Sequence, residues 1–444
     1  MDKLNSSYVP HLFRYAINLA NQEGRPLFLL VVATKPCYIK LASLAFALQR
    51  KGVPFLLVDT GQHFDPVLTG AKEELNYQHL ISVNLCIKGD LLERTVDLAH
   101  KIRWLVQELR AAGLSESPIP VVSGDTSSAA LFPIFWYLQT GCRSVHVEAG
   151  LRSFGPEIDW RWQEGEHLLS QRLVHWRRFR DEPFPEGIDT TLASVASDLL
   201  LAPVSRNADN LITEGYAPDK IRLVGSLSVD AVALATAGGS HSYRGISSEL
   251  SQGRWLRVDI HRRENTTPER LRAILLGIAG FSDRGGHVVL VMTNALRSAV
   301  TQHRMTDLLQ QLEHQGVLIQ DLWPCYLDVI HFIRSSNCVA VFTDSGGLQE
   351  ETNILGVPCI TCRYSTDRPE TVLDSPSNLL LPPFDEELIS KGLEEILTSS
   401  SLQAWRNSQP QKLYGKNVGE RIAELLSKYT PPPPAKGSHA FLHM

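Results

Sequence analysis

The sequence has no surplus of positive charge. Its 444 residues include 43 Lys and Arg against 48 Asp and Glu, which gives a formal net charge of −5. Proteins that bind nucleic acid or anionic membranes by electrostatic attraction carry an excess or a concentrated patch of basic residues. The composition therefore argues against both kinds of partner. What remains is an ordinary globular composition, 43% hydrophobic and 20% charged.

A disulfide framework, a metal motif and a long apolar run are also missing. The seven cysteines are scattered and odd in number, which favours a reducing compartment. Cys359 and Cys362 form a CxxC, but no second Cys/His pair lies nearby to complete a zinc site. The N-terminal MDKLNSSYVPHLFRYA lacks a signal-peptide core, and no apolar run reaches membrane-spanning length. We therefore expect a cytoplasmic protein that holds no metal.

Short apolar runs alternate with helical patterns along most of the chain, beginning with LFLLVVAT (27–34). This βαβ rhythm predicts an α/β fold with parallel sheets covered on both faces. The rhythm breaks over 151–187, restarts after KIRLVG (220–225), and shows no internal sequence repeat. We expect two doubly wound domains, 1–224 and 225–408, with an active-site cleft between the carboxyl ends of their strands. The helix at about 409–429 is expected to join the first domain, and the tail 430–444 to be disordered.

Ionisable or small polar groups follow the apolar strands in both halves. They are Lys35, Gln62, His63, Asp125, Glu148, His261 and the run Asp344–Glu351. A single such residue is as well explained by a helix cap or a turn. Several together, at the strand ends that line the cleft of an open sheet, favour a binding site.

Three of these strand ends leave two interpretations open. Asp125, in SGDT, is either a helix cap or a site residue. Glu148 ends the apolar run SVHV, so it is either paired, for instance with Arg152, or an acid/base group with a raised pKa. HRREN (261–265) is either a solvated turn or a cationic site for a diphosphate. FTDSGGLQEE (342–351) has the strand, glycine turn and helix start of a phosphate cradle, although it carries two glutamates.

Six motifs in order resemble those of the non-hydrolysing UDP-N-acetylglucosamine 2-epimerase family. They are VVSGDTSSA, HVEAGLRS, PFPEGIDTTLASVASDLLLAP, HRREN, FTDSGGLQEE and STDRPETV, and the resemblance spans about residues 27–430. It implies a GT-B fold of two Rossmann-like domains. It also implies interconversion of UDP-GlcNAc and UDP-ManNAc without a nicotinamide cofactor, by elimination of UDP to 2-acetamidoglucal and re-addition. The family often forms homodimers.

The resemblance also implies roles for single residues. The matched acid/base and catalytic groups are Asp125, Glu148, Glu186 and His261. In FTDSGGLQEE, Ser345, Gly346 and Gly347 match the diphosphate cradle, and Glu351 matches the acid that binds the ribose. The other expected substrate contacts are Lys35, Lys40, Arg262, Asn294 and Arg368.

The chain departs from the family pattern in several motifs. TKPC stands where the family has RPE, so Lys35 and Cys37 replace an arginine and a glutamate. PEGIDT (185–190) keeps Glu186 but has Gly187, Asp189 and Thr190 in place of a glutamate, an asparagine and an arginine. TGQH (60–63) is intact, but the altered neighbours give no reason to assume allosteric regulation.

An insertion rich in Trp and Arg occupies 159–182. It predicts a lid or a dimer contact, because Trp and Arg favour interfaces, or else a surface helix without a catalytic part. For the whole chain, a hydrolysing epimerase, an epimerase of a modified UDP-sugar such as a 2,3-diacetamido uronic acid, a GT-B glycosyltransferase and a non-catalytic nucleotide-sugar-binding protein stay open as alternatives.

Overall fold

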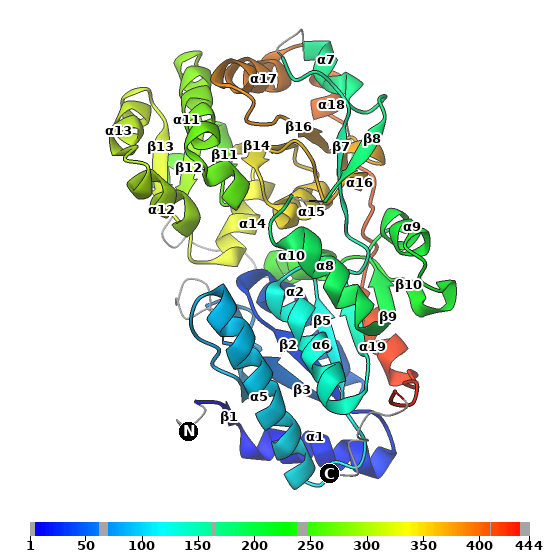
Figure 1. The fold of residues 1–444 in the computed structure, drawn as a ribbon. Coiled ribbons are helices and arrows are strands. Elements are labelled where there is room, and N and C mark those ends of the chain that lie inside the picture. Colours follow the sequence, from blue (N-terminus) through cyan, green and yellow to red (C-terminus); the bar gives the residue numbers. More distant parts are fainter. Residues whose placement is uncertain are drawn as a thin grey trace. The chain divides into compact units, whose positions relative to one another are not determined.

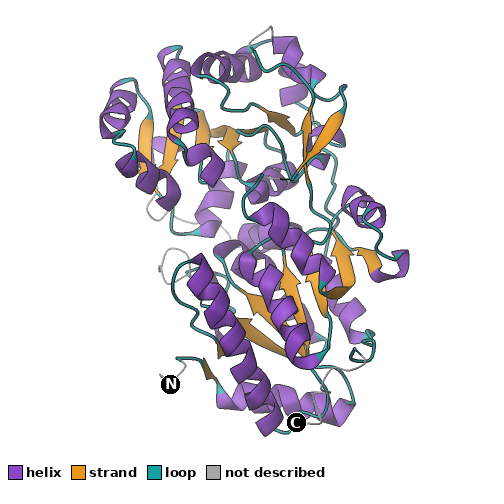
Figure 2. Ribbon diagram, viewed as in Figure 1, coloured by secondary structure: helices purple, strands orange, loops and turns teal. Residues whose placement is uncertain are grey.

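The fold is taken from a computed structural model, which describes residues 5–61, 70–161, 165–180, 182–237, 247–408 and 410–435. The chain divides into two compact units, each built around its own parallel sheet (Figures 1 and 2). Unit 1 comprises residues 1–151, 185–234 and 414–444, and unit 2 comprises 152–184 and 235–413. The chain therefore passes from one unit to the other four times.

The sheet of unit 1 has the strand order β1-β4-β3-β2-β5-β6-β9-β10, in which only β1 is antiparallel to its neighbour. Its strands are β1 (Ser7–Tyr8), β2 (Phe28–Val32), β3 (Phe55–Asp59), β4 (Ile81–Asn84), β5 (Ile119–Ser123), β6 (Ser144–Val147), β9 (Ser197–Ala202) and β10 (Ile221–Leu223). Its α-helices are α1 (Pro10–Glu23), α2 (Lys35–Arg50), α4 (Ala71–Glu74), α5 (Leu91–Ala111), α6 (Ser127–Thr140), α8 (Glu186–Val195), α9 (Ser205–Thr213) and α19 (Val418–Ser427), with α10 (Ser228–Ala237) at the unit boundary.

Helices cover both faces of this sheet because its central strands are apolar on both sides. All five residues of β2 are buried. On one face, α5, α6 and α8 lie side by side (Figure 1) and share a core with Leu29 and Val31 of β2. On the other face, α19 packs on α2 so closely that a Cβ at Gly419 would lie 3.0 Å from the backbone of Ser43. The C-terminal helix is therefore an integral layer of unit 1.

The sheet of unit 2 is fully parallel, in the order β13-β12-β11-β14-β15-β16. Its strands are β11 (Trp255–Asp259), β12 (Val288–Met292), β13 (Leu318–Asp321), β14 (Cys338–Thr343), β15 (Cys359–Thr361) and β16 (Asn378–Leu380). Its α-helices are α7 (Gly165–Ser170), α11 (Pro268–Asp283), α12 (Asn294–Gln302), α13 (Thr306–His314), α14 (Tyr326–Arg334), α15 (Gly346–Leu355), α16 (Glu370–Leu373), α17 (Glu386–Thr398) and α18 (Gln403–Arg406). Short 3₁₀ turns are η1 (Gln78–Leu80) and η2 (Pro218–Lys220) in unit 1, and η3 (Ser248–Ser251) and η4 (Arg263–Thr266) in unit 2.

Strand periodicity divides the core of unit 2 into two layers. Val288 and Leu290 of β12 pack with α11 and α17, whereas Val289 and Val291 face a second cluster formed with α14. Trp323, which belongs to this second cluster, is 1% exposed. The same alternation decides which side chains of β11 face α14.

The Trp/Arg-rich insertion belongs to unit 2. Strands β7 (Ser153–Pro156) and β8 (Trp176–Phe179) form an antiparallel ribbon, and α7 lies between them in the chain. Gln171 is fully buried at the sheet edge, where its side-chain Oε1 accepts from Leu380 N (2.8 Å) and its Nε2 donates to Leu380 O (3.3 Å). The side chain thus satisfies the backbone of edge strand β16 as a neighbouring strand would. Trp162, within the insertion, lies outside the described residues.

The domain boundaries differ from the sequence prediction in two places. Residues 152–184 were expected in the first domain, but they pack in unit 2, where Trp160 and Leu168 enter its core. The boundary expected at 224/225 lies at 234/235. The reason for the second difference is Gly225, whose φ is 99° and where a Cβ would lie 2.4 Å from Tyr414 O, so this stretch packs inside unit 1. Of the expected disordered tail, 436–444 lies outside the described residues.

Candidate active site

Glu148 forms a buried ion pair in unit 1. It follows β6, only 4% of it is exposed, and its Oε1 accepts from Lys40 Nζ at 2.6 Å. Lys40 lies on α2 and is 8% exposed. The sequence left two ways to bury this glutamate, pairing or protonation, and the structure shows pairing. An ammonium at this distance favours the charged carboxylate, and removing either partner of such a buried pair costs about 3–5 kcal/mol.

The backbone around Glu148 is shaped to present its carboxylate. Glu148 has a φ of 64°, which is costly for a residue with a side chain and is found most often at functional positions. A Cβ at Gly124, at the end of β5, would lie 3.2 Å from Glu148 Oε2, so glycine leaves room for the carboxylate. His146, fully buried on β6, holds the turn through Nε2 and Gly124 O (2.9 Å) and through Nδ1 and Ser194 Oγ (3.0 Å).

Two further carboxylates meet beside this turn. Asp125 precedes α6, but the helix cap is the neighbouring Thr126, whose hydroxyl accepts from Ala129 N. Asp125 is therefore not needed as the cap. Asp189 of α8 is 7% exposed and accepts from Ser127 Oγ at 2.7 Å. Burial and the negative charge of Asp125 raise the pKa of Asp189 to about 6, against the opposing hydrogen bond from Ser127.

The other predicted residues of unit 1 lie at helix starts. Glu186 is the first residue of α8, one turn before Asp189, and Lys35 is the first residue of α2. Cys37, which stands where the family has a glutamate, is buried. Burial and the charge of Glu148 both raise the pKa of its thiol, against hydrogen bonds from Thr34. Gln62 and His63 lie outside the described residues.

In unit 2 the organising group is the fully buried Asp344, directly after β14. Its carboxylate accepts from the backbone N–H groups of His261 and Arg262, both at 3.0 Å, and from Asn265 Nδ2, also at 3.0 Å. These bonds fix the turn that follows the neighbouring strand β11. The solvated-turn interpretation of HRREN is therefore wrong for its backbone, which is held to the adjacent strand end.

His261 is placed between two carboxylates. Its Nδ1 lies 3.3 Å from Asp259 Oδ1 and 3.4 Å from Asp344 Oδ1, while 38% of the side chain stays exposed. Burial opposes protonation of the ring, but the charges of Asp344 and Asp259 and the hydrogen bond to Asp259 outweigh it and raise the pKa of His261. The ring can therefore carry a positive charge toward an anionic ligand.

The cradle at the start of α15 has the expected form. Ser345 is the N-cap, and its Oγ accepts from Leu348 N at 3.3 Å. A Cβ at Gly346 would lie 2.9 Å from Asp367 Oδ2, so packing requires this glycine. Among the described residues, a Cβ at Gly347 would meet nothing closer than Ser345 Oγ at 3.8 Å. Packing therefore does not require Gly347, and its small size fits the approach of an anion to a helix N-terminus.

The two glutamates of α15 have different surroundings. Glu350 is fully buried and pairs with Arg368 Nε, and Arg368 Nη1 also donates to Asp367 Oδ2 at 2.9 Å. Arg363 Nη1 bonds the other oxygen of Asp367 at 2.9 Å. Burial tends to raise the pKa of Asp367, but the charges of these two arginines and Arg262 hold it well below its usual range. Arg368, expected as a substrate contact, thus braces Glu350 and Asp367.

Glu351 is half-buried, and its Oε1 accepts from Tyr326 Oη at 3.0 Å. This carboxylate therefore lies beside α14, away from the buried Glu350 network. Asn294 is the exposed first residue of α12, whose cap is Thr293.

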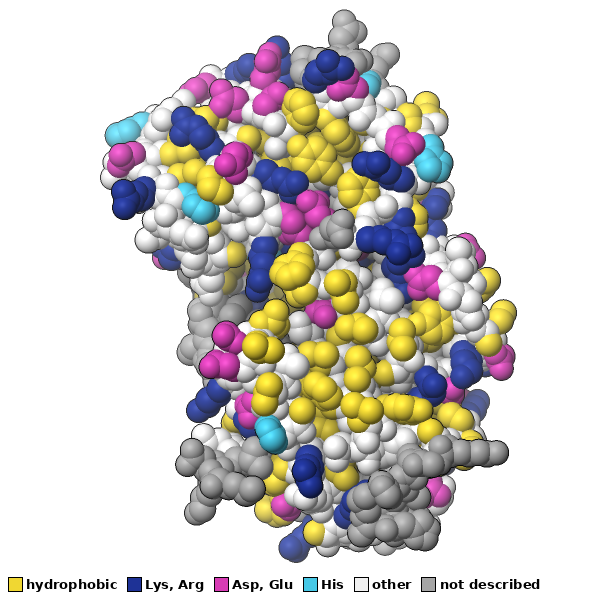
Figure 3. Space-filling model, viewed as in Figure 1, with side chains coloured by type: hydrophobic (Ala, Val, Ile, Leu, Met, Phe, Trp, Pro, Cys, Tyr) yellow, Lys and Arg dark blue, Asp and Glu magenta, His cyan; other side chains and the backbone are white. Residues whose placement is uncertain are grey.

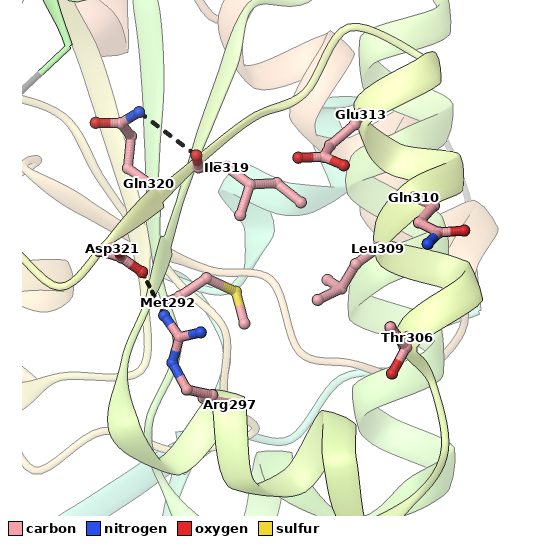
Figure 4. A pocket seen from close by; sticks show the side chains of 9 residues that line it. All are labelled: Met292, Arg297, Thr306, Leu309, Gln310, Glu313, Ile319, Gln320 and Asp321. Atoms are coloured by element: carbon pink, nitrogen blue, oxygen red, sulfur yellow. Dashed lines mark hydrogen bonds and ion pairs between the residues drawn. The ribbon is translucent and has the colours of Figure 1, made fainter.

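A cavity of about 440 Å³ opens at the β13 edge of the same sheet. Met292, Leu309 and Ile319 point into it, and polar side chains lie around the opening (Figure 4). The ion pair between Arg297 and Asp321 lies at one side of it. None of the predicted site residues lines this cavity.

Known proteins share both the sequence pattern and the fold. The model of the UDP-N-acetylglucosamine 2-epimerase family matches residues 177–427. The chain belongs to this family. A UDP-N-acetylglucosamine 2-epimerase of Methanocaldococcus jannaschii is 29% identical over 407 residues, which cover 90% of this chain and 98% of the relative. A UDP-2,3-diacetamido-2,3-dideoxy-D-glucuronate 2-epimerase of Pseudomonas aeruginosa is 26% identical, with 90% and 99% covered.

Among solved structures, the M. jannaschii UDP-GlcNAc 2-epimerase in complex with UDP-GlcNAc and UDP is similar with a TM-score of 0.73 at 27% identity. The alignment covers 90% of this chain and 99% of that one. Together with the two parallel sheets, this confirms the expected fold class, two Rossmann-like domains as in GT-B proteins. Within the described part of this family member, no helix has the length and apolar character needed to cross a membrane.

Sequence reasoning missed three residues of the site. Asp189 was treated only as a departure from the family, although its place one turn after Glu186 puts both on one helix face. Asp259 was hidden inside the apolar-looking WLRVDI, although alternation along β11 places it on the same face as His261. Tyr326 had no signal in the sequence, because its bond to Glu351 depends on how α14 packs beside α15.

Proposed function

We propose that this chain interconverts UDP-GlcNAc and UDP-ManNAc without net hydrolysis. In this proposal unit 2 holds UDP, and the carboxylates of unit 1 move the proton at C2. The observation that carries it is the set of buried acids in unit 1. The paired Glu148 is charged, while the neighbouring Asp189, with a pKa near 6, can be neutral, so both protonation states are at hand near neutral pH.

The reaction needs help at two atoms, because the C2 proton of a sugar is not acidic. A carboxylate takes the proton from C2 while the C1–O bond breaks and its electron pair leaves with the diphosphate. The C1=C2 double bond of 2-acetamidoglucal forms, and the epimer results when UDP adds back to C1 and the proton returns to the other face of C2. Asp125, Glu148 and Glu186 are proposed as the acid/base groups, and Asp189, beside Asp125, as a further carboxyl that can hold a proton.

The leaving diphosphate gains a full charge, which cations and N–H groups must stabilise. We assign this task to His261, Arg262 and the Ser345–Gly347 cradle, and the ribose hydroxyls to Glu351. Lys35 and Asn294 remain proposed substrate contacts. For Lys40 and Arg368 the proposed role is indirect, since they hold Glu148 and Glu350 in place.

The test is incubation of the purified protein with UDP-GlcNAc in deuterated water, followed by proton NMR. The proposal requires UDP-ManNAc that carries deuterium at C2. Release of free ManNAc with UDP would instead identify a hydrolysing epimerase. Unchanged UDP-GlcNAc would exclude this substrate.

A second candidate substrate is a UDP-sugar with an acidic sugar ring. A pocket of about 560 Å³ in unit 2 is lined by Arg177, Arg178, Phe179, Arg180, Glu182, Arg270 and Tyr364. Four guanidinium groups against one carboxylate suit a uronate. The pocket also adjoins the segment after His261, because Arg270 lies in the first turn of α11 and Phe184 N donates to Glu264 of η4 at 2.7 Å. The P. aeruginosa relative is named for such a uronate.

Parallel turnover of UDP-GlcNAc and UDP-2,3-diacetamido-glucuronate separates the two candidates. If the acidic sugar is the substrate, replacing both Arg177 and Arg180 by Gln should raise its KM about tenfold or more, as expected for lost charge-assisted hydrogen bonds. Arg161→Gln is the matched control, because Arg161 lies on the same insertion but pairs with Asp159 and does not line the pocket. Turnover of UDP-GlcNAc alone would reject the acidic substrate.

We propose, as the sequence resemblance implies, that the protein forms a homodimer, and that α5, α6 and α8 of unit 1 make the contact. Leu92, Leu138 and Ile188 on these helices are 73%, 71% and 58% exposed. The face of unit 1 seen in Figure 3 carries many apolar side chains. Light scattering should show a dimer that Leu138→Glu dissociates and Leu173→Glu, an exposed leucine of unit 2, leaves intact.

A further inference from the structure

Strand β11 carries a pair of opposite charges that leads directly to His261. Residues two apart on a strand face the same side of the sheet. Arg257 and Asp259 therefore face the same side of β11, and His261 continues their row just beyond the strand, whereas Val258 and Ile260 between them belong to the opposite core. Arg257 Nη2 donates to Asp259 Oδ2 at 2.9 Å, and Asp259 Oδ1 lies 3.3 Å from His261 Nδ1.

Burying the charges of this row costs free energy. Arg257 is 2% exposed, and its guanidinium lies 4.1 Å over the ring of Trp323. Its Nε and Nη1 have no hydrogen-bond partner among the described residues. Apolar residues at 257 and 259 would complete the strand without this cost, because replacing a buried ion pair by apolar residues is often neutral or stabilising.

Each member of the row acts on the next. Asp259 is 7% exposed. Burial alone would raise the pKa of its carboxyl, but the bond to His261 and the charge of Arg257 lower it to about 2. Asp259 is therefore a carboxylate at any physiological pH. The other charged groups that face the ring are Asp344, which also stabilises its positive charge, and Arg262, which opposes it. Cys338 of β14, whose buried thiol has its pKa raised to about 12, is neutral beside Arg257.

We propose that Arg257 and Asp259 are positioning residues for His261, which fix the orientation of its ring and keep its positive charge in place. With Nδ1 directed at the two carboxylates, Nε2–H is left to donate to the anion that this turn binds. The inference rests on the proposed function only for the identity of that anion, the departing diphosphate. The row itself is a property of the free protein.

The test measures the titration of the His261 ring by NMR on the full chain with labelled histidine, with the signal assigned from His261→Gln. In wild type we expect a midpoint above the ordinary pKa of a histidine, because two carboxylates lie beside the ring. In Asp259→Asn it should fall by about one pH unit, the size expected when a carboxylate at hydrogen-bond distance loses its charge. His303, which bonds Thr266 O in the same unit, serves as an internal control that should not move.

Asp259→Asn leaves the buried Arg257 without its partner and can fail to fold. The double variant Arg257→Met/Asp259→Thr removes both charges, and should fold and show the same fall in midpoint. In both variants the alkaline limb of the kcat profile should shift to lower pH by the same amount, whereas a purely structural role would lower kcat equally at all pH values. An unchanged His261 midpoint in the double variant overturns the proposal. The titration does not need turnover, so it stands even if the proposed reaction fails.

Discussion

The two units share the same architecture, but their strand ends carry groups of opposite charge preference. In unit 1 the strand ends carry acids: Asp125 and Glu148 follow β5 and β6, and Glu186 and Asp189 start α8. In unit 2 the strand ends carry groups that attract an anion, namely a histidine between carboxylates, arginines and a glycine-rich helix start. In both, one buried charged residue holds the group at the strand end: Lys40 pairs with the side chain of Glu148 in unit 1, and Asp344 accepts from the backbone of His261 and Arg262 in unit 2. The comparison teaches that the chemistry of a parallel sheet is decided by a few residues after each strand.

The largest effect should come from removing the acid of unit 1. Glu148→Gln should lower C2 proton exchange by about 10³-fold or more, because a general base is lost, while UDP affinity stays within a few fold. NMR exchange and calorimetry with UDP measure the two. Asp198→Asn is the matched control, since Asp198 also pairs with a lysine of unit 1, Lys220, at 2.6 Å. Near-normal exchange in Glu148→Gln would remove this residue from the catalytic set.

A second effect concerns stability and its pH dependence. With a pKa near 6 in the folded chain against about 3.9 unfolded, Asp189 destabilises the native state increasingly as the pH rises from about 4 to 6. Asp189→Asn should therefore raise the free energy of unfolding at pH 7 by about 1–3 kcal/mol. Urea unfolding at pH 7 and pH 4 tests this, because the gain should disappear at the lower pH. Equal gains at both values would contradict the assignment.

The glycines of the cradle give a paired test of unit 2. Gly347→Ala has room for its methyl group and should keep stability, but lower UDP affinity about tenfold by blocking close approach of the diphosphate. Gly346→Ala should instead destabilise the protein by about 1–3 kcal/mol, because its methyl group meets the Asp367 carboxylate. Thermal unfolding and UDP titration together separate the two outcomes. If Gly347→Ala binds UDP as wild type does, the diphosphate lies elsewhere.

The smallest expected effect lies at Glu351. Tyr326→Phe removes the hydroxyl that orients this carboxylate and should weaken UDP binding about threefold, a small effect because the hydroxyl acts only through Glu351. The affinity for inorganic pyrophosphate, which has no ribose, should not change. An equal loss for both ligands would place Glu351 at the phosphates.

Sequence patterns predicted what is local and missed what depends on distant packing. The strand ends of both sheets could be predicted, because apolar runs followed by polar residues are written in consecutive positions. The pairing of Glu148 with Lys40 could not, since Lys40 is 108 residues away and its place depends on how α2 packs. The insertion was interpreted as a lid, a dimer contact or a surface helix, because nothing in its sequence shows that Gln171 would replace a strand beside β16. The row of Arg257, Asp259 and His261 was not predicted, because its charged residues stand within an otherwise apolar run.

The four passages of the chain between the units have a consequence for synthesis on the ribosome. Neither unit is a continuous stretch of sequence, so each can finish folding only after a later segment of the chain has been synthesised. Unit 2 receives its β7–β8 ribbon well before its own sheet exists, and unit 1 waits for α19, near the end of the chain, to cover α2. A half-protein cut at a single site would therefore leave one unit without a core element, and only fragments divided at all four passages contain every segment of one unit.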